Sequence, residues 1–154
     1  MEIGFKGKFT HNIDHKGRVS IPSTLRRALP RKARGSFVVM KGLDGCLFLY
    51  PRSEWERVQR RLKGLPFWKA DTRRFSRIFL ENAYDVEVDT QGRVKIPQEL
   101  LEVAKFKKEV LFLGVLDRIE IWNPKIYAKY LSERKGTLEE AAEKVFVPRE
   151  GDAD

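Results

Sequence analysis

The sequence contains few residues that could bind a metal or form a disulfide, with one cysteine and two histidines among 154 residues. Cys46 has no partner within the chain for a disulfide, and its neighbours Leu47 and Phe48 indicate a thiol packed in the interior. Structural zinc sites take about four Cys or His ligands, which this chain cannot supply from three such residues. We therefore expect no metal and no cofactor.

Long apolar runs are also missing. No run approaches the roughly 20 residues that span a bilayer, and residues 1–6 lack the apolar stretch of a secretory signal. Hydrophobic residues make up 42% of the chain, which suffices for a core in one compact domain or two small inseparable ones. We expect a cytoplasmic protein with no membrane partner.

Patterns typical of catalytic sites are absent from the sequence. There is no glycine-rich phosphate loop, no Gly-x-Ser-x-Gly turn and no pair of carboxylates in apolar surroundings. We therefore expect that the protein is not an enzyme and has no small-molecule substrate.

What the sequence does contain is a repeat. Residues 14–22, Asp-His-Lys-Gly-Arg-Val-Ser-Ile-Pro, return as residues 89–97, Asp-Thr-Gln-Gly-Arg-Val-Lys-Ile-Pro. Period-two alternation before each segment predicts a half-buried strand, and alternation after the loop predicts a short return strand. Pro22 and Pro97 end that strand and favour the start of a helix. Two copies of one unit that share a core are therefore expected.

The second half of each unit repeats as well. Residues 37–51 predict a hairpin around the turn Asp44-Gly45, and residues 110–124 predict its counterpart. Each hairpin continues into a helix, expected over residues 53–63 and 124–134. Both units thus follow the order β-loop-β-α-β-turn-β-α. We predict a mainly β fold with short helices (α+β), duplicated about a pseudo-two-fold axis within one chain.

Segments outside the repeat complete the expected organisation. Asp71 is expected to cap a linking helix that ends near Asn82, and Thr137 to begin a final helix by a capping box. The polar end, residues 148–154, is expected to fray. The predicted boundaries are residues 5–58 for the first repeat, 59–79 for the connector and linking helix, 80–131 for the second repeat and 132–154 for the C-terminal helix and tail.

Charge is divided unevenly between the halves. Residues 1–75 hold 18 Lys and Arg against 6 Asp and Glu, whereas residues 76–154 hold 13 against 16. A one-sided basic excess is typical of a surface that binds a polyanion, and a solvated basic surface is the alternative.

The loops between the first two strands of each unit hold the candidate site. Gly17 and Gly92 are expected at positive φ, and the Asp and Arg that flank each turn could pair across it. That pairing alone would make the motif a structural turn, but the first loop also carries donors that can reach phosphate or a guanine edge. The candidate nucleic-acid-binding residues of this loop are Arg18, Lys16 and His15, although a solvated turn histidine is an equal alternative for His15. The candidate loop-ordering residues are Asp14, Gly17, Asp89 and Gly92.

Other conspicuous residues favour structural roles. His11 is expected on an inward strand face, as a core histidine. The arginines of residues 57–61 and 73–77 are typical of solvated helix faces, and the Trp and Phe residues lie at core spacing rather than as a platform for bases.

These two Asp-x-x-x-Arg loops, each followed by Val-x-Ile-Pro and a helix, resemble the tandem repeats of the MraZ family, relatives of the AbrB and MazE swapped-hairpin regulators. The resemblance covers nearly the whole chain, including Leu49-Tyr-Pro-x-x-Glu-Trp55. It implies a swapped-hairpin AbrB-like β-barrel core and sequence-specific binding to double-stranded DNA. It assigns DNA contact to Arg18 and Arg93. It further implies nucleoid association and regulation of the division and cell-wall gene cluster through direct repeats upstream of its own gene.

Two alternatives to DNA binding stay open, and so does the assembly of the chain. An antitoxin-like module that binds a protein could use the same fold, although such antitoxins usually have one short repeat and a long disordered tail. RNA is a further candidate, because charge does not distinguish it from DNA. The apolar connector Leu65–Trp68 and the helix carrying Phe75 and Phe79 could contact another chain or cover the protein's own core. The resemblance implies a homo-oligomeric ring, and we predict a closed homo-oligomer larger than a dimer.

Overall fold

The chain folds as two copies of one run of elements, four strands with a short helix after the second and a longer helix after the fourth. The computed structural model describes residues 3–134 and 136–146 and is a mixed α+β structure. The strands are β1 (Phe5–Asn12), β2 (Arg18–Ser20), β3 (Ser36–Lys41), β4 (Leu47–Pro51), β5 (Tyr84–Glu87), β6 (Arg93–Lys95), β7 (Glu109–Leu116) and β8 (Arg118–Trp122). The helices are α1 (Ser23–Arg27), α2 (Arg52–Lys63), α3 (Ala70–Leu80), α4 (Gln98–Ala104), α5 (Pro124–Glu133) and α6 (Leu138–Val145), with a 3-10 turn over Arg31–Ala33.

The two copies exchange strands. The main sheet is antiparallel in the order β1-β7-β8-β4-β3-β5, so the first strand of each copy pairs with the third strand of the other. Exchanging the copies leaves this order unchanged, which places a pseudo-two-fold axis between β4 and β8. The pairing agrees with the swapped-hairpin prediction. Among the described strands the hydrogen bonds leave β1 and β5 as open edges, so the predicted closure into a β-barrel is not seen.

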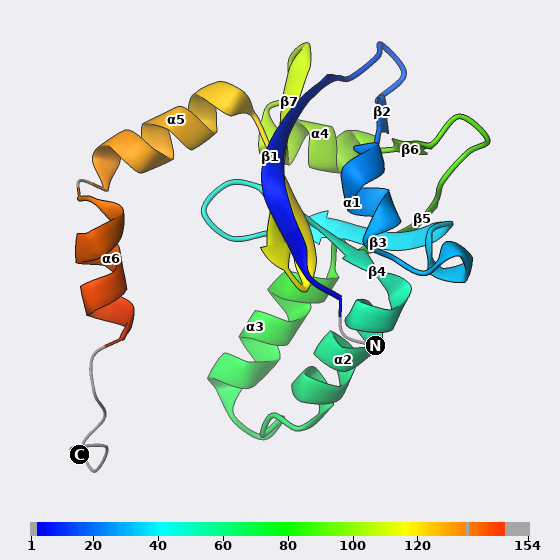
Figure 1. The fold of residues 1–154 in the computed structure, drawn as a ribbon. Helices are drawn as coiled ribbons and strands as arrows, with labels where there is room; N and C mark the ends of the chain where they lie inside the picture. Colours follow the sequence, from blue (N-terminus) through cyan, green and yellow to red (C-terminus); the bar gives the residue numbers. More distant parts are fainter. Residues whose placement is uncertain (1–2, 135, 147–154) are drawn as a thin grey trace.

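One core lies between the main sheet and the short ribbon formed by β2 and β6 (Figure 1). The prolines at residues 22 and 97 occupy the N-cap positions of α1 and α4. The helical spacing of Leu25 with Leu29 and of Leu100 with Ala104 predicted an apolar face, and all four side chains are buried in this core. Their burial fixes the ribbon on top of the sheet.

A second core lies on the opposite face of the sheet, which α2, α3 and α5 cover. Cys46 belongs to this cluster and is fully buried, as its sequence neighbours predicted. Burial raises the pKa of its thiol to about 12. Among the described helices, none combines the length and apolar character needed to cross a bilayer.

Helix boundaries differ from the predictions by a few residues. Helix α3 begins at Ala70, with Lys69 at its N-cap, so the predicted capping role of Asp71 is wrong. The backbone N–H of Lys69 donates to the carbonyl of Pro66, and this turn starts the helix earlier. Thr137 caps α6 as predicted, because its hydroxyl oxygen accepts from the N–H of Glu140. The fraying predicted for residues 148–154 lies outside the described residues.

The aromatic side chains of the connector are not core residues. Phe67 and Trp68 are 73% and 71% exposed, and Phe75 on α3 is 44% exposed. Phe67 and Trp68 lie in the turn between α2 and α3, which projects away from the sheet, so no layer is available to cover them (Figure 1). Phe75 lies within α3, where its ring stacks on that of Phe79. The prediction that every Trp and Phe packs in the core is therefore wrong here, as is the alternative that Phe67 and Trp68 cover their own core.

Candidate nucleic-acid interface

The candidate site is the ribbon of β2 and β6 with the loops at its two ends. Loop one comprises residues 13–17 and loop two residues 88–92, and both project from the same side of the molecule (Figure 1). The ribbon is antiparallel, with Arg18 opposite Lys95 and Ser20 opposite Arg93. The valines between them are buried, so the four paired side chains lie on the outer face. Three of the four are basic.

Loop one is organised by the carboxylate of Asp14. Its Oδ1 accepts from the backbone N–H groups of Lys16 and Arg18, both at 2.9 Å, and its Oδ2 accepts from Nε of Arg18 at 2.8 Å. Gly17 adopts φ of +81°, as predicted. The N–H of Arg18, together with its side chain and the N–H of Lys16, lowers the pKa of Asp14 to about 2. The carboxylate therefore holds the loop in one shape while it remains ionised.

Loop two has the same geometry. Oδ1 of Asp89 accepts from the N–H groups of Gln91 and Arg93 at 2.8 and 2.9 Å, and Oδ2 accepts from Nε of Arg93 at 3.0 Å. Gly92 has φ of +77°, and the N–H of Arg93 lowers the pKa of Asp89. The predicted Asp–Arg pairing is thus confirmed in both loops.

The hydrogen bond to Asp orients each arginine but uses only one of its three guanidinium nitrogens. In each loop the hydrogen bond to Asp uses Nε, and within the described residues Nη1 and Nη2 of Arg18 and Arg93 have no hydrogen-bond partner. These terminal nitrogens are the ones an external acceptor could reach. His15 and Lys16 are exposed at the tip of loop one. The structure therefore brings together the predicted donors of loop one and places Arg93 at the other end of the ribbon.

Each loop rests on the other repeat. The carbonyl of Gly17 accepts from the N–H of Ile96 at 2.8 Å, and the carbonyl of Gly92 accepts from the N–H of Ile21 at 3.1 Å. A Cβ at Gly92 would meet the guanidinium of Arg26 at 3.0 Å, so an arginine of the first repeat lies against loop two. At Gly17 the corresponding neighbour is the apolar Leu101.

Two basic residues of this surface were missed from the sequence. Lys95 lies on the outer ribbon face, and its spacing of two from Arg93 could have identified it. Arg26 reaches loop two only through the exchange of strands, and no local pattern in the sequence indicates that contact.

Residues interpreted as structural have structural contacts. Nδ1 of His11 lies 2.7 Å from the carbonyl oxygen of Ser20, and its ring packs edge-on against Phe112. The arginines of α2 at positions 57, 60 and 61 are exposed on the sheet face opposite the ribbon, as expected of a solvated helix face. Within the described ranges no group of three His, Cys, Asp or Glu side chains is placed to hold a metal ion.

Fold and loops together define a class of protein: two copies of one unit that exchange strands, each with an Asp-x-x-x-Arg loop on a shared ribbon. A family model described as "MraZ protein, putative antitoxin-like" matches residues 5–78 and again residues 79–147. The chain belongs to the MraZ family.

Relatives support this assignment over most of the chain. The sequence is 46% identical over 137 residues to "Transcriptional regulator MraZ" of Caldanaerobacter subterraneus subsp. tengcongensis, covering 89% of this chain and 93% of the relative. It is 45% identical over 142 residues to the protein of the same name from Heliobacterium modesticaldum, covering 92% and 96%. With the protein of that name from Desulforamulus reducens it shares 44% identity over 141 residues, again covering 92% and 96%.

Proposed function

We propose that the protein is a sequence-specific DNA-binding transcriptional regulator that acts in the cytoplasm, at the nucleoid. The observation that carries the proposal is the basic ribbon, on which two loops of the same geometry each hold an arginine whose terminal nitrogens have no hydrogen-bond partner among the described residues. A two-stranded ribbon fits the major groove, and arginine can contact the O6 and N7 atoms of guanine bidentately. The relatives named as transcriptional regulators support the same conclusion.

The roles divide by position. Arg18 and, with a smaller share, Arg93 read base edges. Lys16 and His15, exposed at the tip of loop one, contact phosphate. Asp14 and Asp89 order the loops, with Gly17 and Gly92 supplying the positive-φ positions. In this proposal residues 5–58 and 80–131 form the two AbrB-like repeats.

Assembly supplies the discrimination that one ribbon lacks. A ribbon of three residue pairs touches only a few base pairs, too few to distinguish an operator from competing genomic sites. Several linked protomers that read direct repeats would raise the selectivity through effective concentration. The proposed operators are direct repeats upstream of the protein's own gene, in the division and cell-wall cluster. The proposed form is a closed homo-oligomeric ring larger than a dimer, with the exposed Phe67 and Trp68 at contacts between chains.

A gel-shift comparison tests DNA binding. The duplex upstream of the protein's own gene should be shifted at lower protein concentration than a scrambled duplex or a folded RNA. Equal affinity for the two duplexes would reject sequence specificity, and preference for the RNA would reject DNA as the partner. Light scattering at micromolar protein and moderate salt tests assembly, and a monomer there would reject the ring.

An antitoxin-like role is the second candidate function, because the description of the matching family includes the term "antitoxin-like". In that role the protein would bind a partner protein. The Arg18→Ala variant distinguishes the two functions, because it should weaken specific DNA binding if the protein is a regulator. If the upstream duplex is not shifted at all while a partner protein is captured in stoichiometric amount, the antitoxin-like role replaces the regulator.

A further inference from the structure

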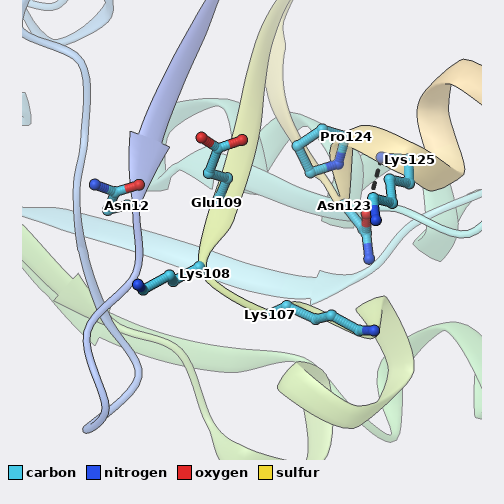
Figure 2. Close-up of a pocket in the computed structure, with 7 residues that line it drawn as sticks. All are labelled: Asn12, Lys107, Lys108, Glu109, Asn123, Pro124 and Lys125. Atoms are coloured by element: carbon cyan, nitrogen blue, oxygen red, sulfur yellow. Dashed lines mark hydrogen bonds between the residues drawn. The ribbon is translucent and has the colours of Figure 1, made fainter.

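A cavity of about 440 Å³ lies at the foot of loop one, where β1, β7 and the start of α5 meet (Figure 2). Its lining includes Lys107, Lys108 and Lys125, with Asn12, Asn123 and one acidic residue, Glu109. Three ammonium groups against one carboxylate give the cavity a positive potential, although it belongs mostly to the more acidic half of the sequence.

Asn123 fixes the backbone beside the cavity at Lys105 and Lys125. Its Nδ2 donates to the carbonyl of Lys105 at 2.7 Å, and its Oδ1 accepts from the backbone N–H of Lys125 at 2.9 Å. Asn123 is 9% exposed, so this clamp is shielded from water. It ties the connection between α4 and β7 to the start of α5. Because Asn123 already caps the helix, the lysine side chains rather than the helix end provide the attraction for an anion.

The cavity is joined directly to loop one. The N–H of Ile13 donates to the carbonyl of Lys108 at 2.9 Å, and Asn12 is paired with Glu109. Asp14, which organises the loop, follows immediately in the sequence. The corresponding hydrogen bond beside loop two runs from Val88 to the carbonyl of Gly35, so a glycine stands there in place of Lys108.

The lysine side chains do not converge on a single point. Figure 2 shows Lys108 extending toward the end of β1 and Lys107 extending in the opposite direction. Both side chains are exposed. Exposed ammonium groups that point apart beside loop one suit separate phosphates of a nucleic-acid strand better than one small anion.

We infer that this cavity binds the phosphodiester backbone of the DNA strand that passes loop one, which rests on the function proposed above. The ammonium groups of Lys107, Lys108 and Lys125 neutralise phosphates next to the bases that Arg18 reads. The second repeat thereby helps to position DNA on the first repeat's loop, an outcome of the strand exchange.

The test is the salt dependence of DNA binding by Lys107→Gln/Lys108→Gln. The matched control is Arg60→Gln/Lys63→Gln, which removes the same charge from exposed positions of α2 on the other side of the sheet. The slope of log K against log salt should fall by about 1 for each phosphate that the variant no longer neutralises. Upstream and scrambled duplexes should be weakened alike, and the control should keep the wild-type slope. Circular dichroism and thermal melting verify that both variants fold.

Three outcomes separate the claims. If the site variant keeps the wild-type slope while Arg18→Ala still loses specificity, the cavity inference fails and the proposed function stands. If wild-type protein binds no duplex, the proposed function fails and takes the inference with it. If inorganic phosphate or pyrophosphate binds at micromolar concentration, shifts the NMR signals of residues 107–109 and leaves the DNA slope of the variant unchanged, the cavity is a small-anion site and the inference is overturned.

Discussion

Loop one and loop two have the same internal geometry but different surroundings. The hydrogen bonds of Asp14 and Asp89 match atom for atom. Outside those bonds, Gly17 rests against Leu101, whereas Gly92 rests against the guanidinium of Arg26. The repeated motif therefore determines the shape of the loop, while the other repeat supplies part of its chemistry.

The difference between the loops also changes how the charge of the sequence is interpreted. The first half of the sequence, residues 1–75, is strongly basic, and the second half is slightly acidic. Because the strands are exchanged, Lys108 of the second half lies at loop one and Arg26 of the first half lies at loop two. The charge of each half therefore does not give the charge around each loop.

The largest expected difference between the loops is in DNA binding. Arg18→Ala should remove about 1–3 kcal/mol per base recognised, multiplied where several protomers bind together. Arg93→Ala should have a smaller effect, because loop two carries Thr90 and Gln91 where loop one carries His15 and Lys16. Titration of the upstream duplex by fluorescence anisotropy measures both. A loss for Arg93→Ala equal to or above that for Arg18→Ala would contradict the ranking.

The next largest difference is expected in the stability of variants with alanine at Gly17 or at Gly92. Alanine at either position would adopt an unfavourable positive φ, at a cost of about 1–3 kcal/mol. A methyl at Gly17 would also lie 3.2 Å from the carbonyl oxygen of Ile96, whereas at Gly92 it would meet only the end of the flexible Arg26 side chain. Gly17→Ala should therefore lower the free energy of unfolding more than Gly92→Ala in urea titrations. The reverse order would show that the Arg26 side chain yields less readily than the backbone at Ile96.

A smaller difference is expected between substitutions of Arg26 and of its neighbour Arg27 on α1, measured as the salt dependence of DNA binding. Arg26→Gln should lower the salt slope of DNA binding by about 1, since its guanidinium lies against loop two. Arg27 is exposed and serves as the matched control, because Arg27→Gln removes the same charge one position away. If the two variants change the slope equally, the position of Arg26 at Gly92 has no special part in binding.

The smallest effect is expected from acid. The pKa of Asp14 is lowered from 3.8 to about 2, so its carboxylate stabilises the folded state fully above pH 3.8. That contribution is lost as the pH falls from 3.8 toward 2. The difference in unfolding free energy between wild type and Asp14→Asn should shrink across this window. NMR titration of both carboxyl groups should give pKa values below 3.8, and an ordinary value for Asp14 or Asp89 would contradict the observed hydrogen bonds of that loop.

The register of the repeat was enough to predict most of the strands and helices, and also the residues that shape the two loops. Alternation, prolines and the Asp44-Gly45 turn indicated the strands and hairpins, because these signals act within a few residues. Asp14, Gly17 and Arg18 were found for the same reason, with their counterparts in loop two. DNA contact by any of these residues stays a prediction.

What the sequence could not show depends on contacts between distant segments. Arg26 and Lys108 join the loops only after the strands are exchanged, and the open order of the main sheet depends on which edges pair. Phe67 and Trp68 have an apolar composition typical of a core, yet the turn that carries them projects beyond every layer. Composition cannot indicate such a position.

The pairing of β1 with β7 has a consequence for how the chain is made. Phe5 pairs with Leu116, and Asn12 pairs with Glu109. A ribosome adds residues at about 5–20 per second, so β1 waits for several seconds before its partner strand is synthesised. During that time the N-terminal strand has an unpaired edge, which is the kind of segment that chaperones protect. The first repeat therefore completes its folding only after β7 has been synthesised, and the same holds for the loop that we propose reads DNA.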